Sequence, residues 1–427
     1  MAGAADPGLS PAAPLSAAEF AALMAPLGPY GQAPGFAVGV SGGPHSLALA
    51  LLARDFAASR GGRVLALVAD HGLRAESAAE AAWTCQTLEA QGIPARLLAL
   101  GLPRGSAVQE RARQARLAAL LGACAEAGLP FLMLGQHAGD QAETVLFRAL
   151  RGSRASGLAG MAPRRAAAEA VILRPLLETA PARLEALLAA RGLRPLRDPS
   201  NRDPRFTRVR LRQALADPDG TGPGTAALGA AAAAFARRRA GQEAALAARL
   251  GAAAALQPEG FAWLDRAALG EDVLAVAALA ALLRLLSGSE HAPPHDSVLA
   301  LLRQGGGTLH GVLWEGRLLC REPAACAAPV PARPGARWDG RWTLRTLPAD
   351  AGPLTLGALG AGAAAIGRAQ RRGLPARVLA GLPALRCAGI LLAVPALGLG
   401  APARLGFQPE GGPLPGQTAK NPSRTGL

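Results

Sequence analysis

Residues 36–177 alternate short, almost entirely apolar runs with longer helical patterns, and this alternation constrains the fold more than any other feature of the chain. The apolar runs, expected to be strands, cover residues 36–40, 63–70, 95–100, 131–136 and 170–177. The helical patterns cover residues 46–59, 77–92, 106–127, a segment starting near Asp140, and 180–192. Apolar strands separated by helices predict an α/β fold with a parallel sheet covered on both faces. Because such sheets bind ligands beyond the carboxyl ends of their strands, functional residues are expected there.

Gly/Pro-rich breaks divide the 427 residues into expected domains. The α/β domain is expected over residues 1–215 and is followed by the break 216–224. An Ala/Leu-rich stretch then predicts a helical domain over residues 225–323, ending in a hairpin that turns at Glu315-Gly316. A second break, residues 324–336, precedes a small C-terminal α+β domain at 337–407 with strands near 341–347 and 390–397. Residues 408–427 are expected to be a disordered tail.

The chain carries 45 Lys and Arg against 30 Asp and Glu, a net charge of +15. Most of the cations are Arg, which stays charged and binds phosphate in a forked geometry, so a polyanionic partner is expected. The apolar stretches are too short to span a membrane, and the N-terminus lacks a signal-peptide pattern, so the expected location is the cytoplasm. Five scattered cysteines without a CxxC spacing argue against a disulfide framework, a zinc ribbon or a cysteine-held cluster.

The segment 41-SGGPHS-46 follows the first predicted strand and opens a helix. Its glycines allow a close backbone approach, and the amides at a helix start favour an anion. The segment matches neither the GxxxxGK[ST] loop nor GxGxxG. An ordinary strand-to-helix turn is the alternative for these residues taken alone.

Two further strand ends carry polar residues. Asp70 ends the second strand and suits a nucleotide hydroxyl or a metal, although for these residues taken alone a turn-forming Asp-His-Gly is the favoured interpretation. After the fourth strand, His137 precedes Asp140 and Glu143, two carboxylates on one side of a helix start. A capping pair of Asp140 and Glu143 would explain both acids, but not His137, Gln141 or the Arg/Gly/Ser-rich loop behind the helix. The functional interpretation is a magnesium site on phosphates, or a group that steers a nucleophile.

Two basic segments are further candidates for functional residues. Arg113 and Arg116 lie on one predicted helix face, for which an exposed, salt-bridged helix is the default interpretation. The segment 198-DPSNRDPRFTRVRLR-212 closes the first domain with a series of arginines, and a solvated charge run is its plain interpretation.

Together, SGGPHS, ADHGLR, ERARQARL, QHAGDQAETVLFRALRGS and DPSNRDPRFTRVRLR resemble the tRNA(Ile)-lysidine synthetase family, a branch of the PP-loop ATP pyrophosphatases with a Rossmann-like sheet. The motifs occur in the family's order and spacing over roughly residues 15–215, and the later regions match by position and length. The sequence departs from the family's usual SGGxDS at His45, and Gly139 stands where a second acid is common.

The resemblance implies a ligase that joins free L-lysine to C2 of the wobble cytidine in a tRNA(Ile) with a CAU anticodon, with ATP and Mg²⁺ as cofactors. The reaction it implies passes through an adenylated cytidine and releases AMP and pyrophosphate. The same resemblance implies tRNA contact by the later domains, and a homodimer is a further expectation, with no membrane partner. It assigns catalysis to His137, Asp140, Glu143 and Arg113, metal binding to Asp140 and Glu143, ATP binding to Ser41, Gly42, Gly43, Pro44, His45, Ser46 and Asp70, and tRNA binding to Asn201, Arg205, Arg208, Arg210 and Arg212.

Three alternatives stay open at this point. A PP-loop tRNA thiolase usually relies on a CxxC or a dedicated cysteine pair, which the cysteine spacing disfavours. An amidating synthetase of the same fold normally carries a glutaminase domain, and no N-terminal Cys nucleophile is present. The third is an RNA-binding homologue whose catalysis is impaired by His45.

Overall fold

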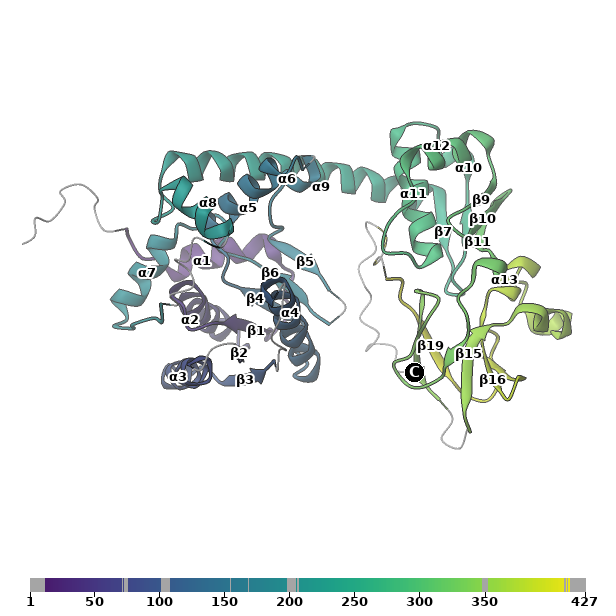
Figure 1. The fold of residues 1–427 in the computed structure, drawn as a ribbon, viewed down its shortest axis with the longest axis horizontal. Coiled ribbons are helices and arrows are strands. Elements are labelled where there is room, and N and C mark those ends of the chain that lie inside the picture. The colour runs from purple at the N-terminus through teal and green to yellow at the C-terminus, as the bar shows by residue number, and fades with distance from the viewer. Residues whose placement is uncertain are drawn as a thin grey trace, which may run out of the picture. The chain divides into compact units, whose positions relative to one another are not determined.

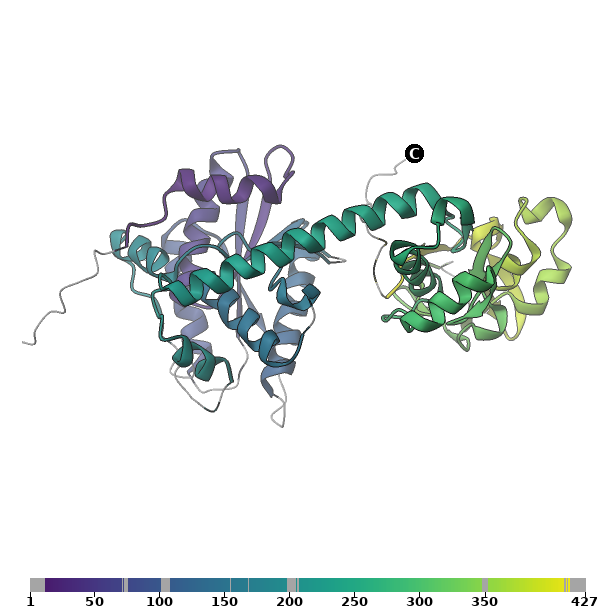
Figure 2. The ribbon, with the colours of Figure 1, turned by 90° about the horizontal axis from the view of Figure 1, so that it is seen from above.

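The computed structural model describes residues 12–70, 72, 76–100, 108–153, 155–167, 169–197, 205, 207–347, 352–410, 412 and 414, without the side chains of residues 108–113 and 156. The chain divides into two compact units between Arg239 and Ala240. This boundary falls inside α9 (Pro223–Ala253), which Figure 2 shows as one continuous helix. The domain limits expected from the sequence, 1–215, 225–323, 337–407 and the tail 408–427, stay predictions. Most of that tail lies outside the described residues.

A six-stranded sheet forms the centre of the first unit (Figure 1). Its strands are β1 (Gly35–Val40), β2 (Arg63–Asp70), β3 (Ala95–Ala99), β4 (Phe131–Leu134), β5 (Arg164–Ala166) and β6 (Val171–Leu173). They lie in the order β3-β2-β1-β4-β6-β5, and every pair is parallel except β5 with β6. The predicted parallel α/β sheet is confirmed. The strand order reverses between β1 and β4, and such a switch point is where open α/β sheets bind ligands.

The last parallel strand is shorter than predicted. The apolar run 170–177 suggested a strand along its whole length, whereas β6 covers only Val171–Leu173. Pro175 has no N–H to donate to a sheet ladder, and residues 175–178 form turns. The hairpin partner β5 was not predicted, because its sequence, RRA, is fully exposed and carries no apolar pattern.

Helices cover both faces of this sheet. The helices before α9 are α1 (Ala17–Met24), α2 (Pro44–Ala58), α3 (Ser77–Ala90), α4 (Val108–Glu126), α5 (Ala138–Leu150), α6 (Ala155–Leu158), α7 (Pro181–Ala190) and α8 (Thr207–Leu215). Side chains alternate across β1: Phe36 and Val38 belong to the apolar cluster that includes α2 and α7, whereas Ala37 belongs to the cluster that includes Leu120 of α4. Burial on both faces explains why the strands are apolar throughout.

The second unit contains helices and three antiparallel sheets. After α9 come α10 (Arg266–Leu269), α11 (Val273–Ser287) and α12 (His295–Gln304). The first sheet has the order β7-β8-β11-β10-β9, formed by β7 (Ala254–Leu256), β8 (Ala262–Leu264), β9 (Gly307–Leu309), β10 (Val312–Glu315) and β11 (Leu318–Arg321). The predicted hairpin is β10–β11, and its connection is Gly316-Arg317. Strands β7 and β8 were not predicted and add to the expected helices and hairpin; each has three residues, in or next to an Ala-rich segment.

Two small sheets occupy the C-terminal part of this unit. One has the order β12-β15-β16-β17-β18 and the other β13-β14-β19. Their strands are β12 (Val330–Pro331), β13 (Arg337–Trp338), β14 (Trp342–Thr346), β15 (Leu354–Ala358), β16 (Pro383–Cys387), β17 (Ile390–Val394), β18 (Leu399–Gly400) and β19 (Arg404–Phe407). The strands predicted near 341–347 and 390–397 correspond to β14 and β17. In the described ranges no helix is long and apolar enough to cross a membrane.

Candidate active site

The predicted phosphate loop, residues 41–46, connects β1 to α2 at the carboxyl edge of the sheet. Gly42 has a φ of +77°, and a Cβ atom built on it would lie 2.5 Å from Thr84 Oγ1 and 2.7 Å from Leu196 Cδ1. Only glycine fits there without moving its neighbours. Gly43 is the N-cap of α2 and Pro44 begins the helix, where its missing N–H is not required.

The two serines of the loop hold its shape. Ser46 Oγ accepts a hydrogen bond from the Ser41 backbone N–H at 3.1 Å and donates one to the Gly43 carbonyl at 3.1 Å. The first amides of a helix have no partner within the helix, and together with the helix dipole they favour a bound anion. The loop therefore suits a phosphate group chiefly through its backbone.

His45 packs against His137 at the edge of the loop. The ring centroids are 4.0 Å apart with an interplanar angle of 69°. His45 Nε2 is buried and has no hydrogen-bond partner in the described part of the chain. Burial, then the charge of His137, lowers the pKa of His45 to about 3, although Asp140 acts in the opposite direction. The ring is therefore neutral at pH 7 and brings no charge to the loop.

Helix α5 begins at Ala138, and its N-cap is His137. His137 Nδ1 accepts a hydrogen bond from the Gly139 N–H at 3.2 Å, and the His137 backbone N–H donates to Asp140 Oδ2 at 3.1 Å. Burial lowers the pKa of His137, so the neutral ring carries its proton on Nε2, 3.4 Å from the same Asp140 oxygen. The alternative of an Asp140–Glu143 capping pair is wrong, because the pair is His137 with Asp140.

Glu143 has no capping role and is only 2% exposed. Its Oε1 accepts a hydrogen bond from Arg212 Nε of α8 at 2.6 Å, while its buried Oε2 has no partner among the described residues. Burial raises the pKa of Glu143, and the Arg212 hydrogen bond and charge offset part of that effect. Arg212 Nη2 also lies 4.0 Å from Asp140 Oδ1. Arg212, which the resemblance assigned to tRNA binding, thus lies beside the carboxylates of Asp140 and Glu143.

Two other polar residues of α5 fold the Arg/Gly/Ser-rich loop onto the helix. The Gln141 side chain donates to the Met161 carbonyl at 3.1 Å and accepts from the Met161 N–H at 2.8 Å. Arg148 Nη1 donates to the carbonyls of Gly157 and Gly160, each at 2.8 Å. These hydrogen bonds give Gln141 a structural role, which is to hold the loop against α5. The sequence alone did not indicate this role.

The remaining predicted residues are more dispersed. Asp70 ends β2, and its Oδ1 accepts hydrogen bonds from the Gly72 N–H at 2.9 Å and the Ser77 hydroxyl at 2.7 Å. Arg210 donates to the Arg205 carbonyl and to Thr207 Oγ1, both at 3.1 Å. Arg208 belongs to the same helix, α8, and its charge lowers the pKa of Glu143. Asn201 and the side chain of Arg113 lie outside the described residues.

Asp140 and Glu143 are the predicted metal ligands. Within the described ranges no group of three or more His, Cys, Asp or Glu side chains could hold a metal ion. The two carboxylates nevertheless supply the hard oxygen ligands that Mg²⁺ prefers, and Mg²⁺ usually keeps water and substrate phosphate in its other positions.

In this sheet, β1 leads through the Gly42-Gly43 turn into α2. His137, Asp140 and Glu143 follow β4, which pairs with β1. This arrangement defines a PP-loop nucleotide-binding domain. A family profile described as a PP-loop domain matches residues 14–218. A tRNA(Ile)-lysidine synthase of Ruegeria pomeroyi is 37% identical over 383 residues, which cover 85% of this chain and 88% of that protein. The chain belongs to the tRNA(Ile)-lysidine synthase family.

Two other relatives each match about half of the chain. A tRNA(Ile)-lysidine synthase of Novosphingobium aromaticivorans is 46% identical over 204 residues, covering 47% of this chain. The matched segments span 61% of that relative and 56% of one from a Bradyrhizobium species. Among solved structures, a U34-tRNA thiolase of Methanococcus maripaludis covers 52% of this chain and 77% of its own, at 16% identity and a TM-score of 0.42. A likeness that weak supports no conclusion about function.

Proposed function

We propose that this chain uses ATP to join the side-chain amine of free lysine to C2 of the wobble cytidine in an isoleucine tRNA with a CAU anticodon. The product would read AUA instead of AUG. The proposal includes action in the cytoplasm and assembly as a homodimer. It is carried by one observation: in a member of this family, the phosphate loop and the His137–Asp140–Glu143–Arg212 cluster lie at the same edge of the sheet.

The first step is adenylation of the base. Cytidine O2 attacks the α-phosphate of ATP, the bond from that phosphorus to the bridging oxygen breaks, and pyrophosphate leaves. The Gly42-Gly43 turn and the α2 amides would hold the phosphates, because preorganised donors stabilise charge that develops in the transition state.

The second step is amine transfer. The lysine nitrogen attacks C2, the bond from C2 to O2 breaks, and AMP leaves with that oxygen. An attacking amine must lose a proton, and Glu143 is the group placed to receive it, since burial makes this carboxylate more basic. His137 would act by holding Asp140, through its backbone N–H and its ring.

We assign Mg²⁺ to Asp140 and Glu143. When bound, it would neutralise negative charge on the phosphates. The Arg212 guanidinium is next to the same two carboxylates, so Arg212 and the metal ion would share Asp140 and Glu143.

The test is a reconstituted reaction. Purified protein is incubated with CAU-anticodon tRNA(Ile), ATP, Mg²⁺ and lysine, and the digested nucleosides are weighed by mass spectrometry. A cytidine heavier by one lysine less water supports the proposal. Cleavage of ATP without that nucleoside would reject it, and a sulfur-sized gain from a sulfur donor would favour a thiolase instead.

A further inference from the structure

The phosphate loop carries no charged side chain. Its six residues are two serines, two glycines, a proline and His45, which is neutral at pH 7. Backbone amides can cradle a triphosphate, but ATP brings several negative charges that donors alone do not neutralise. Mg²⁺ at Asp140 and Glu143 would neutralise part of this charge, and a cationic side chain close to the loop would add to it.

Among the described residues, two arginines carry a charge that acts on His45 of the loop. After burial and His137, the charges of Arg212 and Arg197 lower the pKa of His45. Arg212 is engaged, because its Nε donates to the buried Glu143 at 2.6 Å. Removing it would leave a carboxylate buried without its counter-charge, which is costly. Arg212 is therefore a poor candidate for binding phosphate in the loop.

Arg197 is held much more loosely. Its Nη2 contacts Glu185 of α7 at 2.7 Å, but the side chains are 65% and 41% exposed. An exposed ion pair of this kind adds little stability, so a competing anion can displace it. The preceding residue is fixed to the loop: the Leu196 N–H donates to the Gly42 carbonyl at 2.9 Å. The backbone that carries Arg197 is thus anchored at the phosphate loop while its guanidinium is weakly bound.

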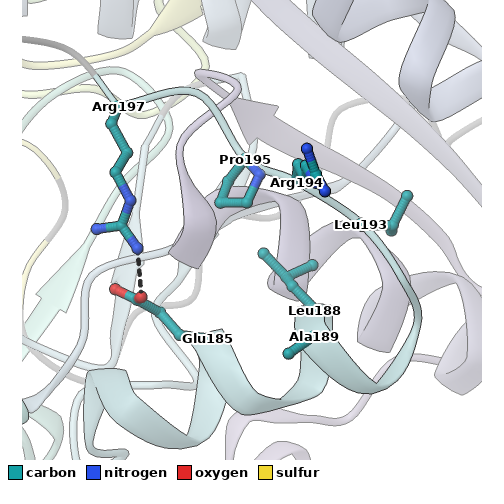
Figure 3. Close-up of a pocket in the computed structure, with 7 residues that line it drawn as sticks. All are labelled: Glu185, Leu188, Ala189, Leu193, Arg194, Pro195 and Arg197. Atoms are coloured by element: carbon teal, nitrogen blue, oxygen red, sulfur yellow. Dashed lines mark hydrogen bonds and ion pairs between the residues drawn. The ribbon is translucent and has the colours of Figure 1, made fainter. Parts of the chain in front are cut away.

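A cavity beside this ion pair gives the guanidinium room to move. It has a volume of about 380 Å³ and lies between α7 and residues 193–197. Figure 3 shows Arg197 reaching across to Glu185, with Leu188, Ala189, Leu193 and Pro195 forming the apolar lining. Arg197 lines this cavity and its side chain is 65% exposed, so its guanidinium has space for another rotamer.

We propose that Arg197 is a phosphate-binding residue for the nucleotide, held by Glu185 until ATP enters the loop. On binding, its guanidinium leaves Glu185 and pairs with the triphosphate, supplying the positive charge that the SGGPHS loop lacks. The inference rests on the proposed function only in placing ATP in this loop. It does not depend on lysine or tRNA.

Equilibrium binding of α,β-methylene-ATP, which cannot release pyrophosphate, tests the assignment by calorimetry on the full chain. Arg197→Gln should weaken binding about tenfold or more, as expected for loss of a charge-assisted contact. Glu185→Gln should tighten it by about two- to fivefold, because the competing ion pair is gone. The double variant should match Arg197→Gln. Arg191→Gln is the control, since Arg191 pairs with Asp55 at 3.2 Å and does not line the cavity.

The two single variants are expected to change affinity in opposite directions, which a folding defect cannot mimic. Unchanged affinity in Arg197→Gln, or weaker binding in Glu185→Gln, would overturn the assignment. Retained analogue binding with weaker tRNA binding in Arg197→Gln would overturn it in favour of an RNA-backbone contact. If the wild-type protein forms no lysidine but the analogue affinities follow the expected pattern, the proposed function fails and this inference stands.

Discussion

Glu143 has the two properties that a proton acceptor for an amine needs: a buried carboxylate with a raised pKa, and one oxygen, Oε2, without a partner among the described residues. Glu143→Gln keeps the shape and removes the basic group. We expect the rate of lysidine formation to fall by about 10²–10⁴-fold, the usual contribution of a general base. The measurement is a single-turnover assay with tRNA binding followed in parallel.

The matched control is Glu126→Gln, since Glu126 forms an exposed ion pair with Arg96. It should leave the rate unchanged. Wild-type rates in Glu143→Gln would remove Glu143 from the chemistry. Loss of tRNA binding in step with the rate would assign it to substrate docking instead.

His45 gives the fold a defined pH dependence. Its pKa is about 3 in the folded chain, against 6.5 for a histidine in water, and burial is the main cause. Because the unfolded chain takes up a proton on this ring below pH 6.5 and the folded chain does not, the contribution to stability is present above pH 6.5 and lost as the pH falls towards 3. From pH 7 to pH 5 the wild type should lose about 1–2 kcal/mol through this residue.

Urea unfolding of the first unit at both pH values measures this loss. His45→Asn should lose correspondingly less stability than the wild type. His295→Asn serves as the comparison, because the His295 side chain is 64% exposed and should leave the wild-type dependence intact. An equal loss in wild type and His45→Asn would show that His45 is not held neutral by the fold.

At the scale of helices and strands, the sequence identified most elements that carry the site. The strands β1 to β4 and the helices α2, α3, α4 and α7 follow the apolar periods closely, because burial on both faces leaves a continuous apolar signature. Strands β7 and β8 escaped prediction, since three residues in an Ala-rich segment carry no period. The contacts that define the site were equally invisible: Arg212 and Glu143 are 69 positions apart, and only the fold pairs them.

Arg148 of α5 is one of two side chains that hold the loop between α5 and β5 on the helix. Arg148 holds the carbonyls of Gly157 and Gly160, each at 2.8 Å. Arg148→Ala should release the loop while the sheet stays folded, because the lost bonds are local. We expect thermolysin to cleave within residues 151–161 several-fold faster, with an unchanged circular dichroism spectrum. Arg96→Ala, which removes an exposed ion pair, is the control, and equal cleavage of the two variants would contradict the role of Arg148.

At the scale of the whole molecule, positive charge dominates. The net charge is +15, and residues 351–409 contain six arginines and no Asp or Glu. Binding of tRNA should therefore release counterions. If about six or more phosphates are contacted, affinity should fall at least about a thousandfold between 50 and 200 mM salt. Fluorescence anisotropy with labelled tRNA measures how the binding affinity depends on salt concentration. An affinity independent of salt would contradict electrostatic binding of the RNA.

In the proposed reaction, the tRNA is adenylated before lysine attacks. The direct measurement uses ATP labelled at the α-phosphate, CAU-anticodon tRNA(Ile) and the full chain, first without lysine. We expect label to accumulate on the tRNA and to be released as AMP when lysine is added. A tRNA that stays unlabelled without lysine, or bound label that lysine does not release, would contradict it.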